Sequence, residues 1–400
     1  MQTNFTTAQL ADPDIRESES ILRTCVHCGF CTATCPTYTL LGDELDSPRG
    51  RIYLIKDMLE NDRPASEDVV KHIDRCLSCL SCMTTCPSGV NYMHLVDHAR
   101  HYIEHTYRRP LHDRVLRRML GQILPRPEVF RAALSMARMG KPFAGWLPGK
   151  LRSMLALAPV RLPRVSPTSR PQVFPSVGPR TRRIALLTGC AQQVLAPQIN
   201  EATIRLLTRH GCEVVVAKGS GCCGALTHHL GQSGQDYARA NVLAWSREIA
   251  SGGLDAIAIN ASGCGTTVKD YGFMFRNDSA VSEQADAVSA LTRDITELMS
   301  EIGLQAPVHP TGQRVAYHSA CSLQHGQRVR NEPKQLLQQA GFTVLDVPEA
   351  HLCCGSAGTY NLMQPEIATR LRERKVTNIE SVSPDLIAAG NIGCITQIAS

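Results

Sequence analysis

The chain alternates between stretches with helical periodicity and short apolar runs that are typical of buried strands. Apolar residues recur at helical spacing in 51–59 and 92–107, and both segments are predicted to be helices. After residue 180, β-rich runs alternate with helical stretches. The runs are 183–190, 212–223, 256–264, 315–321, 342–354 and 386–394, and the helical stretches include 200–208, 237–250 and 333–340. This alternation predicts parallel sheets, whose ligands gather outside the carboxyl ends of the strands.

The middle of the chain has a different pattern. Residues 108–158 have helical periodicity that several prolines interrupt, and prolines then recur at every fourth position from Pro159 to Pro179. Such spacing predicts an extended, semi-rigid connector. We therefore expect a domain boundary near residue 180.

Four cysteines after this boundary recur in register. Each has a counterpart 131 or 130 residues later, in the pairs Cys190 and Cys321, Cys222 and Cys353, Cys223 and Cys354, and Cys264 and Cys394. Because this spacing is preserved over so long a distance, we infer a duplicated module. The cysteines of each copy follow predicted strands and are expected to converge on one crevice. No helix is expected after Cys394, so we also expect that a natural C-terminal tail is missing.

Two C-x2-C-x2-C-x3-C-P runs precede His105. They contain Cys25, Cys28, Cys31 and Cys35 in the first run and Cys76, Cys79, Cys82 and Cys86 in the second. Three thiolates at this spacing can ligate three irons of a 4Fe-4S cube, and the cysteine before proline ligates the other cluster. The spacing thus predicts one cluster on Cys25, Cys28, Cys31 and Cys86 and another on Cys76, Cys79, Cys82 and Cys35. The alternative is structural zinc, which favours two cysteine pairs separated by a wide gap.

Composition places the chain among globular proteins. Hydrophobic residues make up 43% and charged residues 20%, and no apolar run approaches the roughly 18 residues of a membrane-spanning helix. The first residues lack the features of a signal peptide, so we expect a cytoplasmic protein, with peripheral contact at the cytoplasmic face of the inner membrane as a further expectation. In a reducing compartment, clustered cysteines bind metal more often than they form disulfides.

Charge is distributed unevenly around a formal net charge of +6. Residues 106–183 contain 17 lysines and arginines but only two acidic residues, Asp113 and Glu128. This basic stretch is either a solvated linker or a docking surface for an acidic partner or anionic lipid. Charge reversal would separate these alternatives at Arg161, Arg164, Arg180, Arg182 and Arg183. Nucleic acid is not expected, because few aromatic residues are interleaved with the basic ones and no nucleic-acid motif accompanies them.

Two sets of histidines allow more than one interpretation. His94, His98, His101 and His105 share one helical face, which we expect to be solvated or to face a partner. The second set lies beside the repeated cysteines, either as hydrogen-bond donors that support a ligand or in local packing. Its members are His228, His229, His318 and His351. Cys212 has no counterpart in the second copy and is expected to be a core residue.

The cysteine doublets carry a resemblance to known proteins. Each doublet is followed by glycine, at Gly224 and Gly355, and this C…CCG…C module resembles the cysteine-rich (CCG) domain of heterodisulfide reductase. The chain as a whole resembles the family of glycolate oxidase iron–sulfur subunits, particularly in 25–56, 261–272 and 351–362. Subunits of anaerobic glycerol-3-phosphate dehydrogenase and of lactate utilisation are near relatives.

The resemblance implies an α+β multidomain fold. It consists of a helical ferredoxin domain followed by a duplicated α/β cysteine-rich module with parallel sheets. We expect the ferredoxin domain in 1–107, the basic connector in 108–180, the first cysteine-rich domain in 181–305 and the second in 306–400.

The cysteine-rich copies depart from the family pattern at one position each. The full pattern ends in C-x-x-C, but Ala261 and Asn391 occupy the place of the first cysteine. Each copy therefore has four thiols where five are expected: Cys190, Cys222, Cys223 and Cys264 in the first, and Cys321, Cys353, Cys354 and Cys394 in the second. Zinc, a smaller iron–sulfur centre and metal-free redox thiols all stay open for these sites.

The function implied is electron transfer within a complex. The chain has no credible flavin or nicotinamide site and no catalytic residue of its own, so a flavin-containing partner is expected to oxidise glycolate to glyoxylate. Electrons would leave that flavin through the two clusters towards a quinone-like acceptor. The alternatives are an equivalent subunit for lactate or glycerol-3-phosphate, a thiol/disulfide oxidoreductase of the heterodisulfide reductase type, and a scaffold with purely structural metals.

Overall fold

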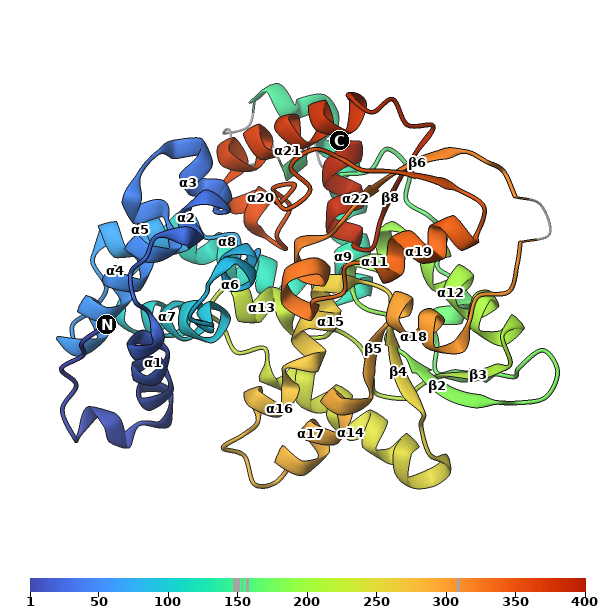
Figure 1. Ribbon diagram of the computed structural model, residues 1–400, viewed down its shortest axis with the longest axis horizontal. Helices are drawn as coiled ribbons and strands as arrows, with labels where there is room; N and C mark the ends of the chain where they lie inside the picture. The colour runs from blue at the N-terminus through green and yellow to red at the C-terminus, as the bar shows by residue number, and fades with distance from the viewer. Residues whose placement is uncertain (147–151, 153, 156–157, 308–309) are drawn as a thin grey trace.

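The computed structural model describes residues 1–146, 152, 154–155, 158–307 and 310–400 (Figure 1). A helical N-terminal region, residues 1–106, lies beside two sheet-containing units. We call these units the first copy (residues 172–302) and the second copy (residues 314–399). The expected α+β class is confirmed.

The N-terminal region is a small bundle around one apolar core. Its helices are α1 (Pro13–Thr24), α2 (Phe30–Ala33), α3 (Pro36–Leu41), α4 (Pro48–Glu60), α5 (Glu67–Asp74), α6 (Ser81–Thr85) and α7 (Tyr92–Thr106), with 3-10 turns η1 (Gln9–Ala11) and η2 (Glu44–Asp46). The two predicted helices are confirmed as parts of α4 and α7. Ser47 starts α4, because its hydroxyl accepts a hydrogen bond from the Gly50 N–H and Pro48 occupies the first helical position. Fully buried Leu22, Ile55 and Leu95 join the helices.

Part of the basic stretch is held against this bundle by ion pairs. The stretch forms α8 (Leu111–Ile123), α9 (Pro127–Gly140) and the 3-10 turns η3 (Lys141–Trp146) and η4 (Pro167–Ser169). The guanidinium groups of Arg109 and Arg117 both lie 2.7 Å from a carboxylate oxygen of Asp74, and both arginines are buried. A solvated linker is therefore the wrong description for this part. Residues 147–151, 153 and 156–157 of the expected connector lie outside the described residues.

The first copy has a five-stranded sheet in the order β1-β3-β2-β4-β5. Its strands are β1 (Gln172–Phe174), β2 (Arg182–Leu186), β3 (Cys212–Val216), β4 (Ala256–Ile259) and β5 (Thr292–Asp294). Its helices are α11 (Ala191–Leu195), α12 (Gln198–Arg209), α13 (Ala225–His229), α14 (Gln235–Gly252), α15 (Ser262–Lys269), α16 (Tyr271–Met274), α17 (Ser282–Leu291) and α18 (Ile295–Ile302). Residues of α12 and α18 pack on one face of the sheet and residues of α14 and α17 on the other.

Strand β1 differs from the expectation for the connector. It pairs antiparallel with β3, with Val173 opposite Val215, whereas the other strand pairs of this sheet are parallel. The first sheet therefore begins before residue 180. The proline repeat concealed this strand, because prolines at regular spacing predict an extended chain but give no sign that the chain pairs with a sheet edge.

The second copy repeats the central part of this sheet with three parallel strands in the order β7-β6-β8. Its elements are β6 (Arg314–His318), the π-helical turn η5 (Ser322–Gln327), α19 (Glu332–Gln339), β7 (Thr343–Leu345), α20 (Tyr360–Met363), α21 (Pro365–Glu380), β8 (Leu386–Ala389) and α22 (Ile392–Ala399). All six predicted strands and all three predicted helices after residue 180 are present. The expectation of no helix after Cys394 is wrong, since α22 contains this residue and corresponds to α15 of the first copy.

The three units contact one another closely (Figure 1). Helix α15 packs against η5, where the hydroxyls of Ser262 and Ser322 lie 2.8 Å apart. Tyr360 of the second copy donates a hydrogen bond to the carbonyl oxygen of Arg75 at 3.0 Å. None of the described helices is both long and apolar enough to cross a membrane.

Candidate functional site

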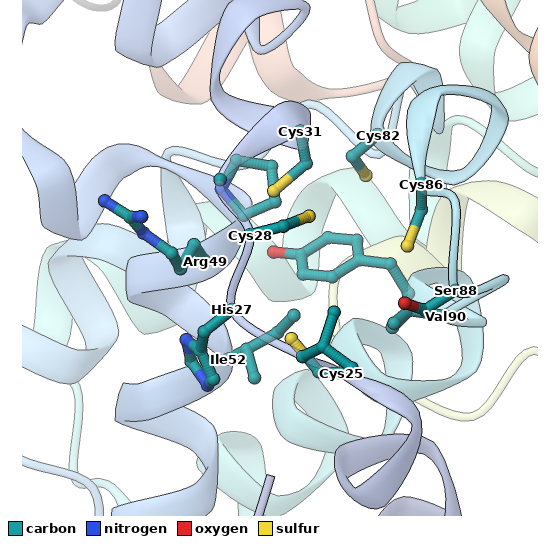
Figure 2. Close-up of a pocket in the computed structure, with 14 residues that line it drawn as sticks. Cys25, His27, Cys28, Cys31, Arg49, Ile52, Cys82, Cys86, Ser88 and Val90 are labelled. Carbon is teal, nitrogen blue, oxygen red and sulfur yellow. The ribbon is translucent and has the colours of Figure 1, made fainter.

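Cys25, Cys28, Cys31 and Cys86 line one cavity, and Cys82 also contributes to its wall. Figure 2 shows the sulfurs of these cysteines around this space. Three of these cysteines come from the first run, and Cys86 comes from the end of the second. We call this space the first cavity. It brings together the four residues that the spacing predicted for one cluster.

A second cavity lies next to the first. It is lined by Cys35, Cys76, Cys79 and Cys82, which is the other predicted set of four. Cys82 lines both cavities, as do Pro48 and Tyr92. The two cavities therefore share a wall.

The loops that carry the cysteines turn in the same way in both runs. His27 and Gly29 of the first run have φ values of 57° and 83°, and Ser78 and Leu80 occupy the same positions of the second run with 48° and 61°. Non-glycine residues rarely adopt this left-handed conformation, so three such residues, at positions matched between the two runs, indicate loops shaped for a ligand. A side chain at Gly29 would also meet the guanidinium of Arg49, at 2.9 Å from its Cβ position.

Burial makes the thiols of these cavities weak acids. It raises the pKa of Cys31 to about 11 and raises the pKa values of Cys79 and Cys82 well above the ordinary thiol value. Thiolates in such surroundings require a bound cation, and a metal supplies it when it displaces the protons. Four soft sulfur donors around one space fit an iron–sulfur cluster.

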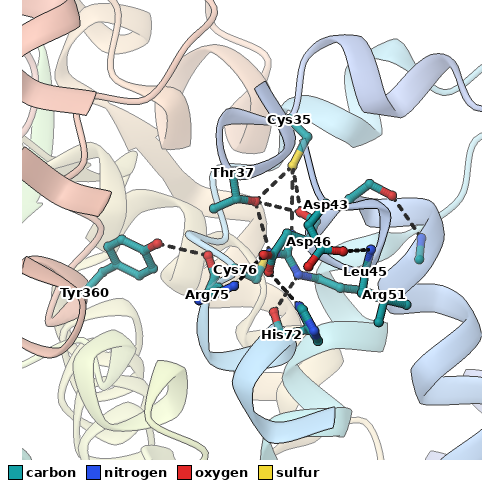
Figure 3. A network of polar contacts seen from close by, with 12 residues as sticks. Cys35, Thr37, Asp43, Leu45, Asp46, Arg51, His72, Arg75, Cys76 and Tyr360 are labelled. Atoms are coloured by element: carbon teal, nitrogen blue, oxygen red, sulfur yellow. Dashed lines mark hydrogen bonds and ion pairs between the residues drawn. The ribbon is translucent and has the colours of Figure 1, made fainter. Parts of the chain in front are cut away.

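A buried charge network supports the second cavity (Figure 3). Asp46 has no exposed surface, and its carboxylate accepts from Arg75 at 2.7 Å and lies 3.4 Å from Arg51. His72 Nδ1 lies 2.9 Å from the same carboxylate, and Arg51 Nε donates to the His72 carbonyl oxygen. Arg51 Nη1 also donates to the sulfur of Cys35 at 3.9 Å. The network fixes a cation beside this sulfur.

Sequence reasoning missed this network, although a signal was present. Arg51 stands four residues before Ile55 and eight before Leu59, so it lies on the apolar face of the predicted helix. A charged residue at such a position is buried and needs partners. Burial alone would lower the pKa of Arg51, but the neighbouring Cys76, Tyr92, Cys35 and Asp46 raise it, so the guanidinium stays charged.

The thiols of the first copy gather at the carboxyl ends of its strands. Cys190 follows β2, Cys222 and Cys223 follow β3, and Cys264 lies in the first turn of α15. The thiols of Cys190 and Cys223 donate to Cys222 and lower its pKa to about 4. The Gly224 N–H also donates to the Cys222 sulfur, at 3.4 Å. All four predicted residues of this copy are in one crevice.

The thiols of the second copy gather in the corresponding place. Cys321 donates to the sulfur of Cys353 at 3.7 Å, and Asn391 donates to the sulfur of Cys394, also at 3.7 Å. One ring nitrogen of His318 and the sulfurs of Cys354 and Cys394 all lie within 4.8 Å of one another. The second copy therefore adds a nitrogen donor to its four sulfurs.

The second cavity adjoins the second copy. Cys79 belongs to the same packed cluster as Cys353 and Cys321 and interacts electrostatically with both. His325 of η5 extends the contact, because its Nδ1 lies 2.7 Å from the hydroxyl of Thr84 in α6. The first cavity, the second cavity and the thiols of the second copy thus lie in sequence through the protein.

The histidine stripe on α7 faces solvent at only two of its four positions. His94 stacks on Phe273 with ring centroids 3.4 Å apart, and its Nε2 lies 2.9 Å from Asp270. His98 Nδ1 lies 2.6 Å from the hydroxyl of Ser18. The first copy and α1 cover His94 and His98, whereas His101 and His105 at the end of the helix are exposed.

The histidines near the cysteine-rich sites have different positions. His228 and His229 reach Asp97 of α7, at 3.3 Å and 3.7 Å, and therefore join the first copy to the N-terminal region. Of these four histidines, His318 is the one whose ring nitrogen lies near cysteine sulfurs, those of Cys354 and Cys394. The backbone carbonyl oxygen of His351 lies 3.3 Å from Nε2 of His325. Cys212 is fully buried in the core, as predicted.

Comparisons with known proteins agree with this geometry. Residues 21–90 match the model of the 4Fe-4S dicluster domain, and residues 184–269 and 315–399 each match that of the cysteine-rich domain. The glycolate oxidase iron–sulfur subunit of Escherichia coli (strain K12) is 46% identical over 402 residues, which cover all of this chain and 95% of that protein. The chain belongs to the glycolate oxidase iron–sulfur subunit family. As a family member it is an iron–sulfur electron-transfer subunit of an oxidoreductase complex.

Other relatives differ in how much they cover. The probable glycolate oxidase iron–sulfur subunit of Bacillus subtilis (strain 168) is 32% identical over 401 residues, with 96% of this chain and 89% of that protein covered. Lactate utilization protein A of Bacillus licheniformis is 26% identical over 219 residues, which cover 54% of this chain and 90% of that protein. The family likeness therefore extends through all three units, whereas the lactate-utilisation likeness covers about half of the chain.

Proposed function

We propose that the eight N-terminal cysteines hold two 4Fe-4S clusters. Cys25, Cys28, Cys31 and Cys86 would ligate the first, and Cys76, Cys79, Cys82 and Cys35 the second. The observation that carries this proposal is the pair of cavities, each lined by one of these sets and separated by a wall that contains Cys82. A bound 4Fe-4S cluster accepts and donates single electrons.

We further propose that the protein serves a flavin-dependent glycolate dehydrogenase complex. A flavin-containing partner would oxidise glycolate to glyoxylate and pass electrons to this subunit, which would deliver them to a quinone-like acceptor. The glycolate assignment rests on the full-length likeness to the Escherichia coli protein named for that activity. A peripheral position on the cytoplasmic face of the inner membrane would bring the subunit to such an acceptor.

The surface around Cys28 is the proposed docking face for the flavin-containing partner. Cys28 is exposed at the rim of the first cavity, whereas Cys79 and Cys82 are buried. Val26 and Phe30 stand on either side of Cys28 in the sequence and are 65% and 61% exposed. Large apolar side chains at a cofactor rim favour a protein contact. Electrons would enter there and leave through the second copy.

The earlier hypothesis that arginines around residue 180 form the docking surface is less favoured. Arg183 pairs with Glu213 and Glu248, at 2.9 Å and 2.8 Å, and Arg180 and Arg182 also pair with acidic residues of the first copy. Charge reversal there would break contacts within this subunit. We therefore keep Arg161 and Arg164 as the two positions for testing contact with lipid or an acidic partner.

The domain division follows the same evidence. We propose 1–107 for the ferredoxin domain, 108 to about 171 for the connector, and a first cysteine-rich domain that starts with β1 rather than at residue 181. The second cysteine-rich domain would occupy 306–400. The change is based on the pairing of β1 with β3.

The alternative of a disulfide reductase has less support. Cys353 and Cys354 are 2% and 0% exposed, so a bulky disulfide substrate has no direct access to them. A lactate or glycerol-3-phosphate complex differs from a glycolate complex in the partner's substrate site. Activity of the purified complex with each hydroxy acid separates these possibilities.

The cluster assignment can be tested on the complex purified without oxygen. Iron and sulfide are measured, and the dithionite-reduced protein is examined by EPR. Cys28→Ser and Cys79→Ser should each reduce the iron content and alter a different part of the EPR signal, because they line different cavities. Cys212→Ala is the matched control, since Cys212 is buried in the first-copy core, and it should change neither. Full iron content and an unchanged signal in both serine variants would contradict the assignment.

A further inference from the structure

His318 occupies an unusual position at the end of β6. His318 is 2% exposed, and its Nε2 has no hydrogen-bond partner among the described residues. One of its ring nitrogens lies within 4.8 Å of the sulfurs of both Cys354 and Cys394. A buried polar group without a partner destabilises the fold, so native proteins rarely keep one without a reason. Coordination of a metal would satisfy this nitrogen.

The donor set around His318 matches the gap in the family pattern. The second copy has Asn391 where the family pattern has a cysteine, and the amide of Asn391 donates a hydrogen bond to Cys394 instead of supplying a ligand. An imidazole can replace a cysteine as a ligand of an iron–sulfur centre. With His318, the second copy again offers five donors, four of sulfur and one of nitrogen.

The first copy has no equivalent of this nitrogen. The offset of 131 residues places Leu187 at the position of His318, and Leu187 is buried in the apolar core of the first copy. Ala261 stands at the position of Asn391. The crevice of the first copy is therefore limited to its four thiols at these positions.

A buried lysine adds to the asymmetry. Lys375 is 2% exposed, donates to the carbonyl oxygen of Glu349 at 2.8 Å, and lies close enough to Cys353 and Cys354 to interact electrostatically. The corresponding residue of the first copy is Ala244. A fixed cation complements a centre that carries the negative charge of several thiolates.

We infer that the second copy binds an iron–sulfur centre in which His318 supplies a nitrogen ligand, together with Cys321, Cys353, Cys354 and Cys394. The inference rests on the proposed function, in which the cysteine-rich copies bind metal. The centre is assigned as iron–sulfur rather than zinc because Cys79, proposed as a ligand of the second cluster, packs in the same cluster of side chains as Cys321 and Cys353. A zinc ion has no redox chemistry to use this contact.

The first test uses the wild-type complex and needs no variant. The protein is produced with ¹⁵N-labelled histidine and with histidine of natural abundance, and the reduced complex is studied by ENDOR. We expect a nitrogen coupling in the signal of one centre that changes with the isotope. If no iron centre shows this coupling, or if the second copy contains zinc in place of iron, the inference is wrong.

Variants then assign the coupling to one residue. His318→Leu should abolish it and lower iron and sulfide by the content of one centre. His318→Cys should keep the iron, abolish the coupling and shift the midpoint potential of that centre. His351→Gln is the matched control, because His351 lies in the same crevice region but outside the donor set, and it should preserve the coupling. Retention of the coupling in both His318 variants would refute the role of this residue.

Iron content and the isotope effect together distinguish a failure of this inference from a failure of the proposed function. If the N-terminal cluster assignment fails, Cys28→Ser and Cys79→Ser leave the iron content unchanged. If only the His318 inference fails, those variants still lose iron while the isotope has no effect.

Discussion

The two cysteine-rich copies share a chain plan but offer different surroundings to their thiols. Each places a cysteine after its central strand (β2 or β6), a doublet after the next strand (β3 or β7) and a fourth cysteine at the start of a helix. The first copy surrounds these thiols with apolar residues such as Leu187, whereas the second adds His318 and Lys375. Duplication has therefore preserved the positions of the sulfurs while their electrostatic surroundings have diverged.

The copies also differ in the segment that follows the first cysteine. In the first copy this is the short α-helix α11, and in the second it is the π-helical turn η5. π-Helical turns are rare and are frequent at functional sites. The turn directs His325 to Thr84 beside the second cavity. In the part of the chain that the structure describes, it is the second copy whose thiols pack against the proposed cluster ligands.

The largest expected difference between the copies concerns electron delivery. Replacement of Cys353 and Cys354 by serine should abolish metal binding in the second copy. It should also slow electron transfer to the acceptor by more than the ~10–100-fold typical of residues that only support a metal ligand. The same change at Cys222 and Cys223 is the matched control and should have a smaller effect. Stopped-flow reduction of the complex followed by quinone addition measures both, and equal losses would remove the functional distinction.

The contacts of the two copies with the N-terminal region should respond to pH in opposite directions. Burial lowers the pKa of His325 from 6.5 to about 4, so neutral His325 stabilises the fold above pH 6.5 and this contribution is lost as the pH falls towards 4. The shift corresponds to at most about 3 kcal/mol. Burial would also lower the pKa of His228, but the Asp97 carboxylate raises it above 6.5. The stability contributed by charged His228 is therefore present below pH 6.5 and is lost as the pH rises through its raised pKa.

Hydrogen–deuterium exchange, corrected for the intrinsic pH dependence, can follow both contacts in one sample. Acidification from pH 7 to pH 5 should increase the exchange of η5 relative to α13, and alkalinisation to pH 8.5 should increase the exchange of α13 relative to η5. His325→Gln and His228→Gln should each remove the pH response of their own segment. A parallel response of both segments in the wild type would contradict the assignment.

The buried lysine should set a difference in potential between the copies. Lys375→Met removes a cation beside Cys353 and Cys354 and should make the midpoint potential of the second-copy centre more negative by tens of millivolts. Lys334→Met is the control in the same copy, because Lys334 pairs with Asp346 on the surface. A redox titration monitored by EPR checks the shift. An equal shift in both variants would show that Lys375 has no special role.

Two buried tyrosines provide the smallest test. Tyr360 donates to the Arg75 carbonyl oxygen across the interface, and Tyr271 donates to the Cys223 carbonyl oxygen within the first copy at 2.8 Å. Phenylalanine at either position should reduce the free energy of unfolding by about 1 kcal/mol. Tyr360→Phe should also increase hydrogen exchange in the N-terminal region next to Arg75, while Tyr271→Phe should not. Thermal unfolding of the holoprotein and exchange measurements give both values.

Much of the architecture follows from local sequence patterns. Six of the seven strands that the structure describes after residue 180 were predicted from their short apolar runs, and the offset of the four cysteines reveals the duplication directly. The conformation of β1 could not be predicted, because its pairing depends on a distant strand edge. The helix at the C-terminus was missed because Ile392–Ala399 has few polar residues to mark a helical face.

In the candidate site, too, some features were predictable from the sequence and others were not. The cysteine spacing predicted which residues would meet in each N-terminal cavity, since the fourth cysteine of a run is separated by its proline. The sequence placed His318 beside the repeated cysteines but left its role open, because an imidazole at the end of a strand has the same sequence signal whether it packs or binds metal. The ion pairs of Arg183 and Arg109 were also hidden, since their partners are distant in the chain.

The exchange of the fourth cysteine between the runs has a consequence for how the protein matures. Cys86 completes the cavity built by the first run, and Cys35 completes the cavity built by the second. Neither binding site is finished until the segments around residues 25–35 and 76–86 have come together. Cofactor insertion is therefore coupled to the folding of the whole N-terminal region, and a fragment with a single run would leave its three remaining sulfurs without the fourth partner.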